Sequence, residues 1–410
     1  MAHAVPSFET VRLGEIDSAR SRHLWTRSGV LVGDDLVVVG RWNGGVTALD
    51  RESIDIEWEF DHVDSAVTLA ATDGSIVVGG RGPSGRIASY DPDTGDERWS
   101  YATATDVGEP SAESVFCRPY VVDVVADGDR SFAAARRYER DRDARRWDSA
   151  VYAFDRDGTV RWRYSTDASP ISVDLDDRGD RLAVGYNRCA GDHDDGLVIL
   201  DAESGRVEWT WDPGTAGDRR VGDVSFGEEC LAVSSHGDKR GYLLGADGSE
   251  LWRADLATET EVGAETLYAY PNHAHATEGR VTFVTGNTYA EEGRETDGRH
   301  PNEHRIVTFD TEGRTLWSAI LGGFAHELAA DGDRLVVPVA QNFRTRDPAT
   351  HALRWFDLAS GDGGVEHLDG IATAADVDGD LVAAIQEPVE YHDEGTVRGE
   401  YALLAGALQG

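Results

Sequence analysis

One segment combines arginines with aromatic residues in a chain that is otherwise strongly acidic: RRYERDRDARRWDSA, residues 136–150. Arginine beside tyrosine and tryptophan is the composition of residues that anchor protein interfaces. A guanidinium can also bind a carboxylate or a phosphate through two parallel hydrogen bonds. We therefore predict that the segment docks an acidic partner protein, through Arg136, Arg137, Tyr138, Arg140, Arg145, Arg146 and Trp147.

Two other interpretations of this segment stay open. Its arginines can form internal ion pairs with Glu139, Asp141 and Asp143, or they can contact nucleic acid locally. The charge of the whole chain opposes the second, because 39 Lys and Arg residues face 76 Asp and Glu residues and the net charge is −37. Such a surface repels phosphate backbones and anionic membranes, so we expect no membrane partner and consider nucleic acid an unfavourable one.

Three histidines are weak candidates for a metal site. His273 and His275 lie in PNHAHATEG, and His326 lies in GFAHELAADGD at the equivalent place of the next repeat. On a strand, His-x-His places both rings on one face, and imidazoles can ligate transition metals. Polar side chains bound to water are the commoner explanation, so we predict no metal and no cofactor.

The sequence contains no Walker loop, GxSxG, HExxH or CxxC motif. Its three cysteines are widely spaced and suggest neither a disulfide framework nor a zinc site: Cys117, Cys189 and Cys230. We therefore favour a protein that is not an enzyme.

Two short phrases recur along the chain and define a repeat. One is an apolar strand, an Asp, a Gly-containing turn and often a Trp, as in IASYDPDTGDERW (87–99) and LVILDAESGRVEW (197–209). Before each copy stands a second strand phrase, such as DGSIVVGG (73–80). With a weaker strand upstream, each of eight copies contains four short strands, which is the pattern of a β-propeller blade.

We predict an all-β, eight-bladed propeller, with four antiparallel strands per blade, that forms a single domain over residues 1–410. The blades are expected near 17–60, 61–101, 106–164, 168–211, 220–254, 262–319, 324–368 and 370–406 plus 7–16. The last blade lacks its outer strand, and the segment 7–16 is expected to supply it and remove an open edge. A closed ring of this kind needs no partner to protect its edges, so we expect a monomer.

The amino terminus lacks the apolar core of a secretory signal, and no apolar run is long enough to span a membrane. The expected location is the cytoplasm. The long insertions fall between the second and third strands of their blades: 136–150, 187–196, 286–304, 340–352 and 387–400. Long connections on a rigid scaffold are where binding usually occurs. We predict that the face bearing them is the binding surface.

The Asp-x-x-Thr/Ser-Gly turn followed by Trp resembles the repeat of PQQ-like, quinoprotein-type eight-bladed propellers. That family includes quinoprotein alcohol dehydrogenases and a non-catalytic lipoprotein of the outer-membrane β-barrel assembly machinery. The resemblance implies that the repeat tryptophans pack between neighbouring blades: Trp58, Trp99, Trp162, Trp209, Trp252 and Trp317.

If the chain resembled the catalytic members of the family, it would be expected to contain a vicinal cysteine pair, a calcium site and an Asp base. The chain has no adjacent cysteines and no segment that matches the calcium ligands, so it resembles the non-catalytic branch. We predict a scaffold for protein–protein interaction. The alternatives are an enzyme with a site in the central channel, PQQ-linked or metal-dependent through the histidines, and a sensor of a small ligand.

The first testable prediction concerns salt. Lys239 is the only lysine in the chain. A large excess of carboxylates with almost no lysine is typical of halophilic proteins, so we expect a protein of the halophilic archaeal type. In about 1 M salt the Debye length is about 3 Å, so the repulsion is screened, whereas in dilute buffer it pushes the fold apart. We expect dialysis from molar KCl into low salt to abolish the native circular dichroism spectrum. An unchanged spectrum and melting temperature would contradict this prediction.

Overall fold

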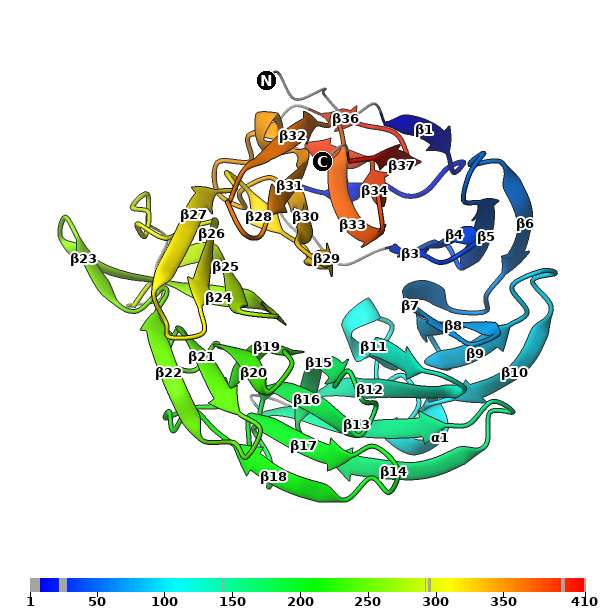
Figure 1. Ribbon diagram of the computed structural model, residues 1–410, viewed down its shortest axis with the longest axis horizontal. Helices are drawn as coiled ribbons and strands as arrows, with labels where there is room; N and C mark the ends of the chain where they lie inside the picture. Colours follow the sequence, from blue (N-terminus) through cyan, green and yellow to red (C-terminus); the bar gives the residue numbers. More distant parts are fainter. Residues whose placement is uncertain are drawn as a thin grey trace. The chain divides into compact units, whose positions relative to one another are not determined.

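The computed structural model describes residues 8–21, 28–141, 144–291, 293, 296–391 and 395–408. The chain forms two compact units, Met1–Val67 with Ala319–Gly410, and Thr68–Ser318. Both are built from antiparallel sheets of about four strands (Figure 1). In the described part, no helix is long and apolar enough to cross a membrane.

The unit Thr68–Ser318 contains an eight-stranded sheet, two four-stranded sheets and a five-stranded sheet that carries the additional strand β23. The eight-stranded sheet combines two four-stranded repeats, which join where β11 pairs with β8. Its strands are β7 (Ser65–Thr72), β8 (Ser75–Arg81), β9 (Arg86–Tyr90), β10 (Glu97–Ala102), β11 (Tyr120–Asp127), β12 (Arg130–Asp141), β13 (Ala144–Phe154) and β14 (Val160–Thr166). Those of the next two are β15 (Ser169–Leu175), β16 (Arg181–Arg188), β17 (Leu197–Asp201), β18 (Val207–Trp211), β19 (Val221–Phe226), β20 (Cys230–Ser235), β21 (Arg240–Gly245) and β22 (Glu250–Asp255). The last comprises β23 (Thr260–Val262), β24 (Glu265–Thr277), β25 (Arg280–Ala290), β26 (Arg305–Asp310) and β27 (Thr315–Ile320). The short helices α1 (Ala104–Val107) and η1 (Val115–Cys117) lie between β10 and β11.

The other unit contains three such sheets and a small three-stranded one, β2-β35-β36. Its first strands are β1 (Glu9–Arg12), β2 (Ala19–Arg20), β3 (Gly29–Val32), β4 (Leu36–Gly40), β5 (Gly45–Asp50) and β6 (Ile56–Asp61). The carboxy-terminal part adds β28 (Phe324–Ala325), β29 (Ala329–Asp331), β30 (Arg334–Ala340), η2 (Pro348–Thr350), β31 (Ala352–Asp357) and β32 (Gly363–His367). It ends with β33 (Ile371–Asp378), β34 (Leu381–Glu387), β35 (Val389–Tyr391), β36 (Thr396–Arg398) and β37 (Ala402–Ala407).

Within Thr68–Ser318, consecutive sheets follow one another along an arc (Figure 1). The first strands β11, β15, β19 and β24 contact one another in turn on its inner side. The middle strands are almost wholly buried, as in β16 and β17, because each sheet has a neighbour on both faces. The fourth strands, such as β18, alternate between exposed and half-buried residues.

Four of the repeat tryptophans contact a glycine turn of the following sheet. A β-carbon on Gly158 would lie 2.5 Å from Trp99, and one on Gly205 would lie 2.5 Å from Trp162. Both glycines also have positive φ, 81° and 68°, which other residues adopt at a cost. Trp209 meets Gly248 and Trp252 meets Gly313 in the same way. For Trp58, which stacks on Phe60 with ring centroids 5.3 Å apart, and for Trp317, packing between blades stays a prediction.

The amino-terminal strand completes the last sheet, as expected from the sequence. β1 pairs antiparallel with β37, with Glu9 opposite Ala405 and Arg12 opposite Ala402. Leu13, which follows it, is buried in a cluster that includes Leu403 and Tyr401. The chain's two ends therefore share one sheet, β1-β37-β34-β33.

The described part of the segment 136–150 is strand and not a loop, which corrects the expectation from the sequence. β12 and β13 continue through residues 136–141 and 144–150 as a hairpin, with Arg136 opposite Ser149, Tyr138 opposite Trp147 and Arg140 opposite Arg145. Residues 142–143 lie outside the described residues. The residues of the two strands alternate between the two faces of this ribbon, but charged residues occur on both faces, so the sequence lacks the apolar–polar alternation that indicates a strand. The other long insertions also join the second and third strands of their sheets, and that part of the expectation is confirmed.

Candidate functional site

The structure separates the seven residues predicted to bind a partner. Arg137 is used internally: its guanidinium contacts Asp148 at 2.6 Å and Glu139 at 3.1 Å, and its Nε donates to the Val107 carbonyl. Tyr138 and Trp147 pack on each other across the hairpin, with centroids 5.4 Å apart, and Trp147 is only 7% exposed. These three side chains stabilise the hairpin.

The remaining four arginines point elsewhere. Arg140, Arg145 and Arg146 are exposed near the end of the hairpin. Arg136 turns inward, where its guanidinium lies 5.5 Å from the centre of the Tyr120 ring and donates to Ser169 Oγ. Burial, together with the nearby Arg81, lowers the pKa of Arg136 to about 10.

Arg81 lies on the same tyrosine. Its guanidinium is 4.6 Å from the ring centre of Tyr120, and its Nε donates to the Val115 carbonyl at 3.1 Å. Tyr120 pairs with both arginines, since it begins β11 and faces Arg81 at the end of β8 and Arg136 within β12. Burial lowers the pKa of Arg81, and Arg118 lowers it further. Two cations therefore share one aromatic ring.

The line of cations continues into the next two sheets. Arg188, at the end of β16, pairs with Ser169 and forms an isolated bridge with Arg219. Asp218 neutralises Arg188 at 2.6 Å. Burial still lowers the pKa of Arg188, and Arg219 and Arg145 lower it further. Arg145, in the hairpin, is thus close enough to Arg188 to interact with it electrostatically.

Arg219 ends the line on a second tyrosine. Its guanidinium lies 4.6 Å from the ring centre of Tyr270, in β24. The His236 ring lies 4.8 Å from the same tyrosine, and its Nε2 is buried with no hydrogen-bond partner in the described part of the chain. Burial and Arg219 lower the pKa of His236 to about 3, so this imidazole is neutral at pH 7. Lys239 stands nearby, 4.9 Å from the Tyr268 ring.

We call this set the arginine–tyrosine row: Arg81, Tyr120, Arg136, Arg188, Arg219 and Tyr270. Within the described ranges, Arg81, Arg136 and Arg219 have no carboxylate at ion-pair distance, although acidic residues are about twice as numerous as basic ones. Most other arginines of this unit, such as Arg98, Arg130 and Arg240, do pair with a carboxylate. Three of the four arginines of the row therefore have no carboxylate partner among the described residues, and Asp218 neutralises the fourth, Arg188.

Of the row, the sequence pattern indicated only Arg136. A signal was present, because an arginine follows the apolar part of the second strand in three consecutive repeats: Arg81 and Arg188 end β8 and β16, and Arg136 lies within the longer β12. Arg219 and Tyr270 had no such periodic signal. They belong to the connection before β19 and to β24, and only the fold brings them to the row.

Buried carboxylates hold the first strands that carry the row. Asp123 accepts the amide of Val173 in the next first strand at 3.1 Å, and Asp174 accepts that of Phe226 at 2.6 Å. Asp223 continues the pattern with the amide of Ala274 at 3.1 Å. Burial raises the pKa of both Asp123 and Asp174 to about 7. These carboxyl groups accept the unpaired edge amides of the next first strand and so fix the order of the strands.

The three candidate metal histidines do not form one cluster in the described structure. His273 and His275 lie on β24, where His273 Nδ1 is 3.6 Å from Asp223 Oδ2 and burial lowers the pKa of His275. His326 belongs to the other unit, where its ring meets Phe324 edge-on at 5.4 Å.

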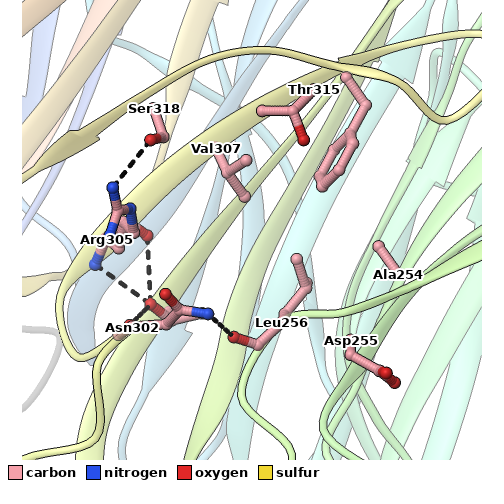
Figure 2. Close-up of a pocket in the computed structure, with 10 residues that line it drawn as sticks. Ala254, Asp255, Leu256, Asn302, Arg305, Val307, Thr315 and Ser318 are labelled. Carbon is pink, nitrogen blue, oxygen red and sulfur yellow. Dashed lines mark hydrogen bonds between the residues drawn. The ribbon is translucent and has the colours of Figure 1, made fainter.

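A cavity of about 280 Å³ lies between the outer strands of two neighbouring sheets (Figure 2). Leu256, Val307 and Phe309 supply its apolar lining. Its polar groups are engaged with one another: Arg305 donates to Ser318 Oγ at 3.0 Å, and Asn302 donates to the Leu256 carbonyl at 2.6 Å. The cavity therefore offers fewer uncommitted donors than the row does.

Comparison with known proteins identifies the family. A family model described as outer membrane protein assembly factor BamB, PQQ_2, matches residues 15–140 and 43–236. Together these matches span more than half of the chain. The chain belongs to this family.

Proteins similar to this BamB-type chain include BamB itself and dehydrogenases. BamB from Moraxella catarrhalis superposes with a TM-score of 0.60 at 15% identity, covering 98% of this chain and 100% of that one. A europium-containing methanol dehydrogenase gives a TM-score of 0.61 at 12% identity, covering 98% and 92%. The quinohemoprotein alcohol dehydrogenase of Comamonas testosteroni is 23% identical over 241 residues, which are 53% of this chain and 31% of that enzyme. The chain thus spans about a third of that curated relative, and the structural likenesses show the fold, a β-propeller of PQQ-like repeats.

The side chains present do not fit a quinone or metal centre of the kind that the resemblance implies. Within the described ranges, no group of three or more His, Cys, Asp or Glu side chains is placed to hold a metal ion. The cysteines are free and separate: Cys117 in η1, Cys189 after β16 and Cys230 in β20. The buried carboxylates already accept backbone amides.

The second testable prediction concerns pH. The folded Asp174 carboxyl keeps its proton up to about pH 7, whereas the unfolded chain releases it near the usual pKa of 3.8. Between these values the folded state binds more protons, so raising the pH lowers the free energy of unfolding, by at most about 1.4 kcal/mol per pH unit for each such group. Replacing both carboxyls in Asp123→Asn/Asp174→Asn should flatten this decline, as measured by denaturant titrations from pH 4 to 7 in molar KCl.

Asp247→Asn is the matched control. Asp247 is an exposed turn residue, and hydrogen bonds from Ser249 lower its pKa. Its stabilising effect is lost as the pH falls, so its removal leaves the decline between pH 4 and 7 in place. Equal slopes in the wild type and the double variant would contradict the assignment of raised pKa values.

Proposed function

We propose that this chain is a non-catalytic propeller scaffold that binds another protein through the face carrying the long connections between second and third strands. The observation that carries the proposal is the arginine–tyrosine row, which runs beside the starts of the first strands β11, β15 and β19. Uncompensated arginines on aromatic rings are typical of interface anchors. In a chain of charge −37 they favour an acidic partner.

The hairpin β12–β13 belongs to the same proposed surface. Its exposed Arg140, Arg145 and Arg146 extend the positive charge beyond the row, and Arg145 lies within electrostatic range of Arg188. The internally paired Arg137 and the mutually packed Tyr138 and Trp147 hold the hairpin rigid. Rigid presentation lowers the entropy lost on binding.

The finer architecture is part of the proposal. Four-stranded repeats recur five times in one unit and three times in the other, which supports the proposal of eight blades. A single closed domain stays a prediction from the sequence. The membership of the BamB family supports a scaffold role. Halophilic adaptation, a monomeric state and a cytoplasmic location rest on the sequence alone and stay predictions.

The third testable prediction is a loss of partner binding. Affinity purification from native extract in molar KCl should recover an acidic partner with the wild type. The triple variant Arg145→Ser/Arg146→Ser/Arg219→Ser should abolish its recovery, because two hairpin cations and one cation of the row are removed. The readout is the quantified protein list from mass spectrometry.

The matched control removes the same charge elsewhere. Arg156, Arg161 and Arg253 are half or more exposed, and each pairs with a carboxylate away from the row. Their replacement by Ser should leave the partner list unchanged. Loss of the same proteins in both triple variants would show a charge effect without a defined surface, and an unchanged list in the first would refute the proposal.

A further inference from the structure

We propose that the arginine–tyrosine row contains two carboxylate-binding positions, one over Tyr120 and one over Tyr270, which together take an acidic segment of the partner protein. This inference rests on the proposed function and names the chemistry that the surface recognises. At the first position Arg81 and Arg136 lie on Tyr120, and at the second Arg219 lies on Tyr270.

The stacking of each guanidinium fixes which of its atoms remain available. A guanidinium on an aromatic face presents its N–H groups at its edge, in the planar fork that matches a carboxylate. Among the described residues, Arg81 makes its side-chain hydrogen bond through Nε alone, to the Val115 carbonyl. The Arg219 side chain makes no hydrogen bond within the described part of the chain, so its whole fork is uncommitted.

No carboxylate of the described residues lies at ion-pair distance from Arg81, Arg136 or Arg219. Asp218 is adjacent to Arg219 in sequence, yet its carboxylate contacts Arg188 at 2.6 Å. Arg188 therefore lies between the two positions as a neutralised pair, while the like charges of Arg81 and Arg136 face each other across Tyr120. A bound anion would relieve this repulsion, and the positions are organised for it before binding.

The ends of the row favour a protein segment over a nucleic acid. Phe116, 39% exposed, lies 5.5 Å from the Arg81 guanidinium at one end. Tyr289, 44% exposed, lies 5.3 Å from Tyr270 at the other. Each position thus has an exposed aromatic ring beside it for an apolar neighbour of the acidic residue. A nucleic-acid duplex carries one negative charge per about 1.7 Å of its axis, so the acidic surface around the row would repel it.

The test uses fluorescein-labelled hexaglutamate, with hexaglutamine as the neutral control, titrated with the full chain by anisotropy in molar KCl. At that salt only contact interactions survive screening. We expect hexaglutamate to bind and hexaglutamine not to bind. Arg219→Lys keeps the charge but loses the fork, and should weaken binding about tenfold. Arg253→Lys, the matched control on an exposed, ion-paired arginine, should change nothing.

The outcomes separate this inference from the proposed function. Equal binding of hexaglutamate by Arg219→Lys and the wild type would overturn the inference, because charge alone would then suffice. Binding of a labelled single-stranded oligonucleotide as tight as that of hexaglutamate would overturn it too. No binding of hexaglutamate to the wild type, with the partner still lost in the triple serine variant, would overturn the carboxylate positions and leave the scaffold intact. Hexaglutamate binding that Arg219→Lys weakens, with the partner list unchanged in the serine variant, would support the positions and refute the scaffold role of this face.

Discussion

The open edges of the first strands are the constraint on which the rest of the structure depends. A strand at the edge of a sheet has backbone amides with no partner in that sheet. Here side-chain oxygens of the preceding first strand accept them, as Asp123 does for Val173 and Asp223 for Ala274. The other unit uses the same device, since Asp376 accepts the amide of Val32 at 2.7 Å. The cost is visible in the raised pKa values of the buried carboxyls.

This edge pairing also places the binding chemistry. Because the first strands of successive sheets are tied side by side, the residues at their ends come together from distant parts of the chain. Tyr120 begins β11, Ser169 begins β15, and Arg219 precedes β19. A line of cations thus forms at one end of four sheets. The tryptophan contacts with the glycine turns act on the outer side of the same sheets and support their spacing.

Local patterns predicted the local structure. The four-strand repeat and the closing strand β1 were readable because each depends on alternation and turn chemistry within a few residues. The hairpin β12–β13 was mistaken for a loop because a charged surface ribbon lacks the apolar alternation of a half-buried strand. The candidate site was only partly predictable. The inward turn of Arg136 and the engagement of Arg137 by Asp148 depend on neighbours from other strands, and Arg219 meets Tyr270 across two sheets.

The central claim is that partner contact occurs at the arginine–tyrosine row. Hydrogen–deuterium exchange of the purified complex tests this most directly, by comparing each amide with the free chain in the same molar KCl. The account predicts slower exchange on complex formation in peptides around Tyr120, Arg188 and Arg219, and at the end of the hairpin near Arg145. Slower exchange confined to the outer strands β14, β18 and β22, with the row unchanged, would contradict it.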